Sequence, residues 1–136
     1  MSWQTYGLDR EAQKLVLEAK ILDPDSLNQA YKMRMAVAYG LERFWGEHLR
    51  LQDDRDKKAN NKSLFWKHTW NSLVEIMAKA GVSIPNDDVD AKNASAVKVM
   101  AAKLWDLEME DQRVAIAVLT QLCDSVVWWT QRYKKK

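Results

Sequence analysis

The chain has 136 residues, 47% of them hydrophobic, which is the size and composition of one globular domain. With only four glycines and two prolines it lacks the turn residues of a many-stranded protein, and a single cysteine excludes a disulfide framework. The formal net charge of +2 implies no particular partner. These features predict an all-α fold in which residues 1–136 form a single-domain bundle of about five helices.

The N-terminal sequence has neither the basic start nor the unbroken apolar stretch of a signal peptide. No window offers the roughly 18 consecutive apolar residues of a membrane span. We therefore expect an intracellular, cytoplasmic, soluble protein without a membrane partner.

The first helical pattern covers residues 9–22, with Asp9 as the predicted N-cap. A long second helix is predicted over residues 24–52, with Asp23 as its N-cap and Pro24 as its first residue. The predicted apolar face of this second helix consists of Leu27, Tyr31, Ala38, Leu41, Trp45 and Leu49.

Residues 53–62 are polar and are predicted to form a loop. Ser63 is the predicted cap of a third helix that stops at Gly81, and residues 82–90 are predicted to connect it to the next helix. Residues 133–136 form a basic tail. The last three helices are expected at residues 63–81, 91–105 and 110–132.

The last helix has an unusually wide apolar arc, which predicts that it is central in the bundle or covered by a partner. Trp129 lies in the middle of this arc and is expected in the core. Trp128 lies at its border, where the ring can pack on its own domain, meet another subunit or meet a base. Trp66 is a second candidate for a subunit interface.

Nothing in the sequence indicates nucleophilic catalysis, because His48 and His68 lack a serine or cysteine partner at a recognisable spacing. His48 is expected to be structural. We predict that the protein is not an enzyme and has no cofactor and no metal site. A helical active site built from Glu47, His48 or His68 remains an alternative.

The strongest functional pattern is a stripe on the predicted second helix, formed by Lys32, Tyr39, Arg43 and Arg50. Steps of 7, 4 and 7 residues return to nearly the same angle, so the stripe would run roughly 27 Å along one face. Such a row of cations with an aromatic ring can follow a nucleic acid strand. The alternative is an ordinary solvated face of mixed charge, diluted by Glu47.

The loop after this helix would extend the positive surface. Arg132, near the C-terminus, is a further candidate contact, although cations at a helix end also favour the helix dipole. The additional nucleic-acid-binding candidates are Arg55, Lys57, Lys58, Lys62 and Arg132.

Residues 112–136, "QRVAIAVLTQLCDSVVWWTQRYKKK", are similar to the C-terminal helix of the type III-B small subunit, with an early arginine, a late tryptophan pair and an Arg-Tyr ending. Residues 28–44, "NQAYKMRMAVAYGLERF", are more loosely similar to the N-terminal helix of that subunit. The chain thus resembles the small helical subunits of type III CRISPR effector complexes.

The resemblance implies a non-catalytic RNA-binding and scaffolding subunit of an antiviral ribonucleoprotein complex. Copies of the chain would stack beside the guide–target duplex, with the target RNA strand or the duplex, other effector subunits and further copies as partners. The alternative function is a protein–protein adaptor or regulatory protein that docks through the apolar face of the last helix.

Overall fold

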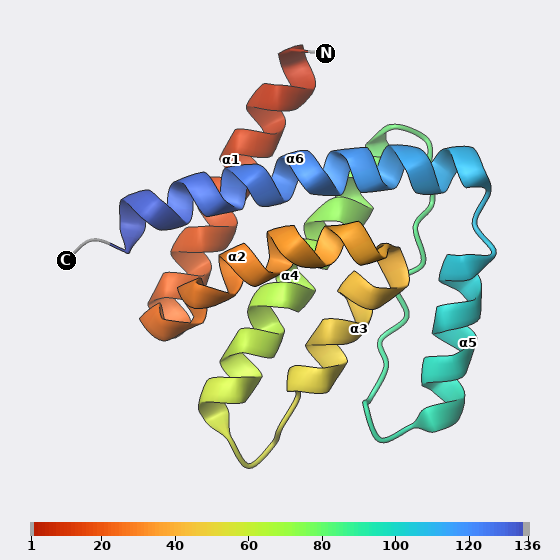
Figure 1. The fold of residues 1–136 in the computed structure, drawn as a ribbon, viewed down its shortest axis with the longest axis horizontal. Coiled ribbons are helices and arrows are strands. Elements are labelled where there is room, and N and C mark those ends of the chain that lie inside the picture. The colour runs from red at the N-terminus through yellow and green to blue at the C-terminus, as the bar shows by residue number, and fades with distance from the viewer. Residues whose placement is uncertain (1, 135–136) are drawn as a thin grey trace.

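The computed structural model describes residues 2–134, with side chains from Gly7 to Lys134, and all regular structure in this range is helical. Figure 1 shows how the elements follow one another along the chain. Across the described residues they are α1 (Ser2–Leu22), η1 (Pro24–Asn28), α2 (Gln29–Ala36), η2 (Val37–Tyr39), α3 (Leu41–Leu51), α4 (Lys57–Lys79), α5 (Ala94–Trp105) and α6 (Met109–Tyr133), where η marks a short 3-10 helix. The predicted all-α fold is confirmed, with six α-helices in place of about five.

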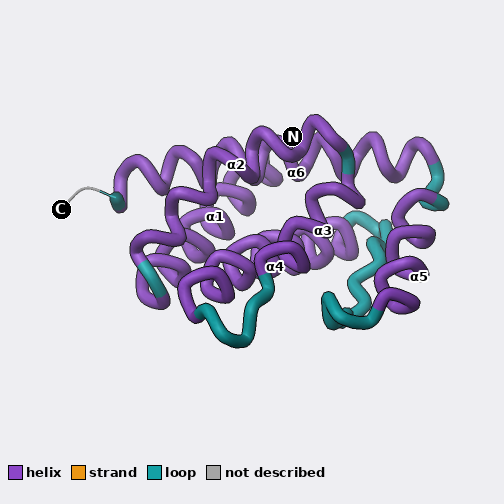
Figure 2. Tube along the Cα trace, turned by 60° about the horizontal axis from the view of Figure 1, so that its bottom comes forward, coloured by secondary structure: helices purple, strands orange, loops and turns teal. Residues whose placement is uncertain are grey.

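Helix α6 spans the molecule and organises the packing (Figure 1). Helix α1 crosses it and also packs on α4, while α2 runs alongside α6. Helices α3 and α4 lie against one another, and α5 stands at the edge, reached from α4 by an extended segment without helix or strand at residues 82–90 (Figure 2). Among the described residues, no helix combines the length and apolarity that crossing a bilayer requires.

The core is dominated by aromatic side chains from α3 and α4. Phe44 and Trp66 meet at a centroid distance of 4.9 Å, and Phe44 also stacks on Trp70 at 6.3 Å. Burying a side chain of this size contributes about 1.5–3 kcal/mol. The largest fully buried side chains include Trp45, Trp66, Trp70, Phe44 and Phe65.

The predicted long second helix is wrong, because residues 24–52 are divided into four short elements. Asp23 and Pro24 act as predicted, since the Asp23 carboxylate accepts a hydrogen bond from the Asp25 amide at 3.0 Å, but they start a 3-10 helix. Gly40 then adopts φ 98° and ψ 173°, a conformation essentially restricted to glycine. The chain therefore turns between Tyr39 and Leu41, and the four stripe residues do not share one continuous helix.

The predicted loop at residues 53–62 is also too long, because α4 begins at Lys57. The carboxylate of Asp56 accepts hydrogen bonds from the amides of Lys58 (3.1 Å) and Ala59 (3.3 Å) and so caps the helix. Ser63, the predicted cap, lies buried inside α4 and donates to the carbonyl of His48 at 2.6 Å. Lys57, Lys58 and Lys62 are therefore helical residues.

At the ends of the other helices, some of the predicted boundaries are confirmed and others are wrong. Gly81, with φ 84°, follows the end of α4 as expected, and a break separates α5 from α6. Helix α1 instead begins before Asp9, whose carboxylate accepts a hydrogen bond from Ser125 at 3.0 Å. Of the predicted basic tail, Tyr133 and Lys134 are described, and residues 135–136 lie outside the described residues.

Candidate nucleic-acid interface

Three of the four stripe residues meet despite the turn at Gly40. Lys32 on α2, Tyr39 on η2 and Arg43 on α3 line one surface hollow of about 240 Å³, together with Met35 and Glu47. The ring of Tyr39 is 69% exposed, and the guanidinium carbon of Arg43 lies 5.3 Å from its centroid. This distance is within the range of a cation–π contact.

The charges of Lys32 and Arg43 are not compensated within the described part of the chain, where neither residue forms an ion pair. Glu47 also lines the hollow, but its carboxylate is held by Arg50 at 2.8 Å. The hollow therefore combines two available cations with an exposed aromatic ring.

A second aromatic–cation pair lies on α6. Trp128 is 54% exposed, as predicted for a rim position, and the guanidinium carbon of Arg132 lies 5.8 Å from its ring centroid and 5.4 Å from that of Trp129. Trp129 packs against the core and stacks on Tyr133 with 5.7 Å between centroids, although it is only half-buried.

Polar contacts hold α2 and α6 side by side in antiparallel order. Arg34 pairs with Asp124 at 2.6 Å, and the Gln131 amide donates to the Tyr31 hydroxyl at 3.2 Å. At the end of the seam, the Lys134 ammonium donates to Asn28 at 2.7 Å. These contacts fix α2 beside α6 along the length of the shorter helix.

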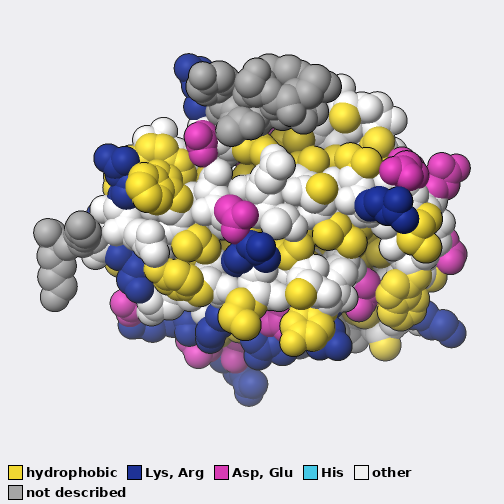
Figure 3. All heavy atoms as spheres, turned by 45° about the horizontal axis from the view of Figure 1, so that its top comes forward, with side chains coloured by type: hydrophobic (Ala, Val, Ile, Leu, Met, Phe, Trp, Pro, Cys, Tyr) yellow, Lys and Arg dark blue, Asp and Glu magenta, His cyan; other side chains and the backbone are white. Residues whose placement is uncertain are grey.

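Figure 3 shows one side of the molecule, on which hydrophobic side chains, lysine and arginine, and some acidic side chains reach the surface. We call the five candidate residues of the hollow and of the α6 pair the aromatic–cationic face. They are Lys32, Tyr39, Arg43, Trp128 and Arg132.

The candidate cations around the turn between α3 and α4 differ, because several of them meet a carboxylate. Arg50 pairs with Glu47, and Lys58 pairs with Asp25 at 2.9 Å. Arg55 lies 3.7 Å from Asp53. The hydrogen bond to Glu47 raises the pKa of Arg50, and the hydrogen bond to Asp25 raises the pKa of Lys58.

The expected continuous stripe therefore ends at Arg43, because the charge of Arg50 is largely cancelled by Glu47. Lys57 and Lys62 form no ion pair with any described residue, but they lie on α4, outside the aromatic–cationic face.

The expectation that Trp66 lies at a subunit interface is wrong. Its side chain is 2% exposed, packs on Phe44, and donates its indole N–H to Gln29 at 3.0 Å. The apolar arc of α6 is likewise used within the bundle, because its central members are buried. These are Ala115, Leu119, Leu122, Cys123 and Val126.

Two exposed residues of this region were not predicted as surface residues. Met35 is 73% exposed beside Tyr39, and Tyr31, expected on the buried face, is exposed one turn earlier. The signal that could have found them is the four-residue spacing of Tyr31, Met35 and Tyr39 along one helical face.

The remaining reactive groups do not form a recognised centre. Within residues 7–134, no three histidine, cysteine, aspartate or glutamate side chains are grouped so as to hold a metal ion. Cys123 is buried, and desolvation raises the pKa of its thiol far above the usual range. This cysteine is an inert core residue.

No family model, curated protein or solved structure matches this chain. The function is therefore inferred from the chemistry of its surfaces.

Proposed function

We propose that this protein is a non-catalytic RNA-binding subunit of a ribonucleoprotein, and that it contacts single-stranded RNA through the aromatic–cationic face. The observation that carries the proposal is the pairing of two exposed rings, Tyr39 and Trp128, each with an arginine beside it. The small-subunit role in a type III CRISPR effector is the specific form of this proposal that the sequence resemblance favours.

Exposed rings and uncompensated cations recognise different parts of a nucleic acid strand. Bases stack on aromatic rings and on guanidinium planes, whereas lysine and arginine neutralise phosphates. An unpaired strand offers both groups at once, while the bases of a duplex are already stacked on one another. The combination at Tyr39 with Arg43 and at Trp128 with Arg132 therefore favours unpaired RNA.

The test measures binding of a fluorescent, unstructured RNA by anisotropy at low salt. Reversing both charges in Lys32→Glu/Arg43→Glu is expected to weaken binding at least about tenfold, which corresponds to about 1.4 kcal/mol. The dependence of log K on log salt should become shallower by about 0.7 for each phosphate that the variant no longer neutralises.

The matched control is Lys92→Glu/Lys98→Glu, which makes the same change in net charge on and just before α5. Both lysines are exposed, and neither pairs with a carboxylate of the described residues. If this control weakened binding as much as Lys32→Glu/Arg43→Glu, binding would reflect net charge alone and the proposed face would be wrong.

A protein–protein adaptor is the second candidate, and the exposure of Met35 next to Tyr39 favours it. Methionine, tyrosine and arginine are enriched in protein interfaces. Docking would then use the exposed residues of α2 and η2, because the apolar face of α6 is occupied by the bundle. Capture of a protein partner that survives nuclease treatment and high salt, without RNA affinity, would support this candidate.

A further inference from the structure

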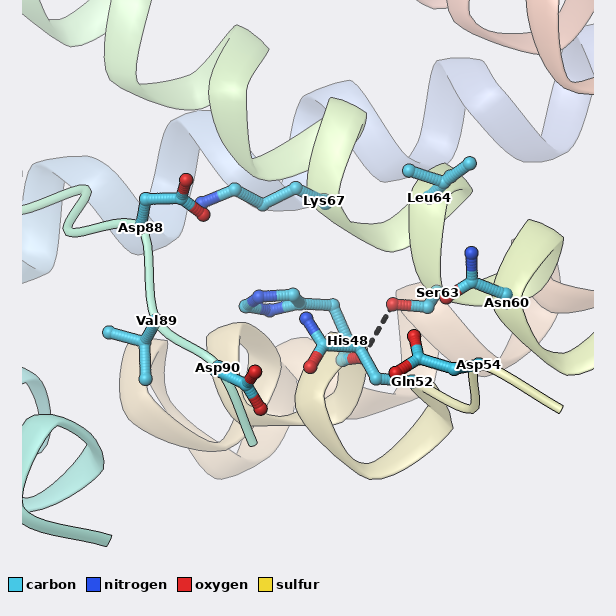
Figure 4. Close-up of a pocket in the computed structure, with 10 residues that line it drawn as sticks. All are labelled: His48, Gln52, Asp54, Asn60, Ser63, Leu64, Lys67, Asp88, Val89 and Asp90. Atoms are coloured by element: carbon cyan, nitrogen blue, oxygen red, sulfur yellow. Dashed lines mark hydrogen bonds between the residues drawn. The ribbon is translucent and has the colours of Figure 1, made fainter. Parts of the chain in front are cut away.

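Another surface hollow lies away from the aromatic–cationic face, between α3, α4 and the segment that precedes α5 (Figure 4). Its volume of about 460 Å³ falls within the range of small-molecule sites, about 300–1000 Å³. Most of the side chains around it are polar, and Leu64 and Val89 supply apolar surface.

His48 gives this hollow a buried hydrogen-bond acceptor. The residue is only 3% exposed, and Figure 4 shows its ring extending from α3 into the hollow. Its Nδ1 contacts the carbonyl oxygen of Trp45, which can only accept, so Nδ1 carries the proton. The other ring nitrogen, Nε2, is then an acceptor, and the one hydrogen bond that the ring forms with a described residue is at Nδ1.

Lys67 and Asp88 place a donor and a carboxylate at the same hollow. Their end groups point toward one another in Figure 4, although they do not form an ion pair. The Lys67 ammonium donates to Asn86 at 2.7 Å, which leaves two further N–H donors. Burial lowers the pKa of Lys67 despite the nearby charge of Asp88, so a ligand acceptor would relieve part of its desolvation.

The charge of the hollow argues against a phosphate group as the ligand. The lining residues include three carboxylates, those of Asp54, Asp88 and Asp90. Lys67 is the only cation among the lining residues. An anionic group would therefore meet net repulsion, whereas a neutral ligand rich in N–H donors would satisfy His48 and the carboxylates.

We propose that this hollow binds a guanine base. Among the four common bases, guanine alone presents adjacent donors, N1–H and the N2 amino group, beside an acceptor, O6. Asp88 would accept from the two donors and Lys67 would donate to O6. His48 Nε2 would accept from the second N–H of the N2 amino group, and the apolar side chains Leu64 and Val89 would contact the ring.

The test uses isothermal titration with guanosine, adenosine, cytidine and uridine on the full chain. Guanosine is expected to bind at least about tenfold more tightly than the others, as one bidentate base contact provides. Asp88→Asn and Lys67→Met should each lose this preference, and both residues are partly or fully exposed, so the fold is kept. Asp106→Asn and Lys98→Met are the matched controls on the exposed surface of α5 and its end.

A second measurement follows the ring nitrogens of His48 directly. Nitrogen NMR should show that guanosine, and not adenosine, shifts the Nε2 signal while the Nδ1 signal stays in place. Equal binding of all four nucleosides, no binding, or a guanosine affinity unchanged in Asp88→Asn would each overturn the proposal.

The base can come from a free nucleoside or from RNA. Guanosine, guanosine monophosphate and a short RNA with one guanine, compared with the same RNA carrying adenine, distinguish these sources. This site is independent of the proposed RNA face, so Lys32→Glu/Arg43→Glu is expected to bind guanosine normally. Loss of guanosine binding in that variant would contradict a separate site.

Discussion

Two regions of this protein differ in how their cations are paired. On the aromatic–cationic face, Arg43 and Arg132 lie over exposed rings and meet no carboxylate among the described residues. Around the turn between α3 and α4, Arg50 and Lys58 are held by acids at 2.8 and 2.9 Å. The first region therefore keeps its candidate cations available to a partner, whereas in the second only Lys57 and Lys62 form no ion pair with a described residue.

The difference arises from tertiary structure and not from composition. Lys58 and Asp25 are 33 residues apart, and they meet because η1 lies beside the start of α4. Arg43 forms no ion pair with a described residue, because the neighbouring acid, Glu47, is already bonded to Arg50. A count of positive residues along the chain would rank the two regions in the wrong order.

The largest expected effect comes from removing the exposed rings. Tyr39→Ala/Trp128→Ala should weaken binding of unpaired RNA by about 1–3 kcal/mol for each ring that stacks on a base. Fluorescence anisotropy measures the loss. Tyr39→Phe/Trp128→Phe keeps two rings and should retain most of the affinity.

Stability provides the control for this variant, because both side chains are more than half exposed. Thermal unfolding of Tyr39→Ala/Trp128→Ala should stay close to that of the parent protein. If the double alanine variant bound RNA with full affinity, the two rings would have no part in recognition.

The second effect tests the turn at Gly40, which lies between Tyr39 and Arg43. Gly40 has φ 98° and ψ 173°, so Gly40→Ala should cost about 1–3 kcal/mol of folding free energy through backbone strain. No atom would obstruct the new methyl group, which leaves strain as the cause. Urea denaturation measures the change.

Gly46→Ala is the matched control for this substitution. Gly46 lies within α3, and an added Cβ would be 3.5 Å from the flexible Glu42 side chain, an ordinary contact. Alanine should therefore stabilise the protein by about 0.5–1 kcal/mol. If both substitutions shifted stability in the same direction, the conformation assigned to Gly40 would be wrong.

His48, a buried residue of α3, should make the folding stability depend on pH. Burial lowers the pKa of His48 below its ordinary value of about 6.5, and the Trp45 carbonyl opposes this only in part. The unfolded chain then binds a proton that the folded chain does not. The contribution of His48 is complete above about pH 6.5 and is lost as the pH falls toward the folded pKa.

Denaturant unfolding at several pH values between about 5 and 7.5 tests this expectation. His48→Gln should be less stable than the parent at neutral pH, and its stability should change less across this range. His68→Gln is the control, since His68 is the other histidine of the chain. An unchanged pH slope in His48→Gln would assign the dependence to other groups.

Periodicity and glycine positions predicted much of the fold and less of the site. The break before α6 and the stop at Gly81 follow from local chemistry, because acids favour a helix start and glycine favours a left-handed end. Asp56 and Ser63 are both of residue types that favour caps, and the prediction that named Ser63 was wrong. The structure uses Asp56 because Ser63 and Asn61 are buried against the bundle.

The site was harder to predict, because its members depend on which residues meet in space. Lys32, Tyr39 and Arg43 were selected on the assumption of one straight helix, and they meet in spite of a turn. Trp66 and Trp128 were both candidates for a subunit interface, yet Trp66 is buried against Phe44 and Trp128 is exposed. Local spacing contains no information on which element covers each ring.

The smallest expected effect provides the sharpest comparison of the two regions. Arg50→Met and Arg43→Met each remove one positive charge from α3, seven residues apart. Arg50→Met should change folding stability by only about 0.2–0.5 kcal/mol, the range of exposed pairs along a helix, and RNA affinity by less than about twofold. Because Arg43 has no acidic partner among the described residues, Arg43→Met should lower RNA affinity clearly more. Equal losses would mean that the ion pair with Glu47 opens when RNA binds and that both ends of α3 contact the strand.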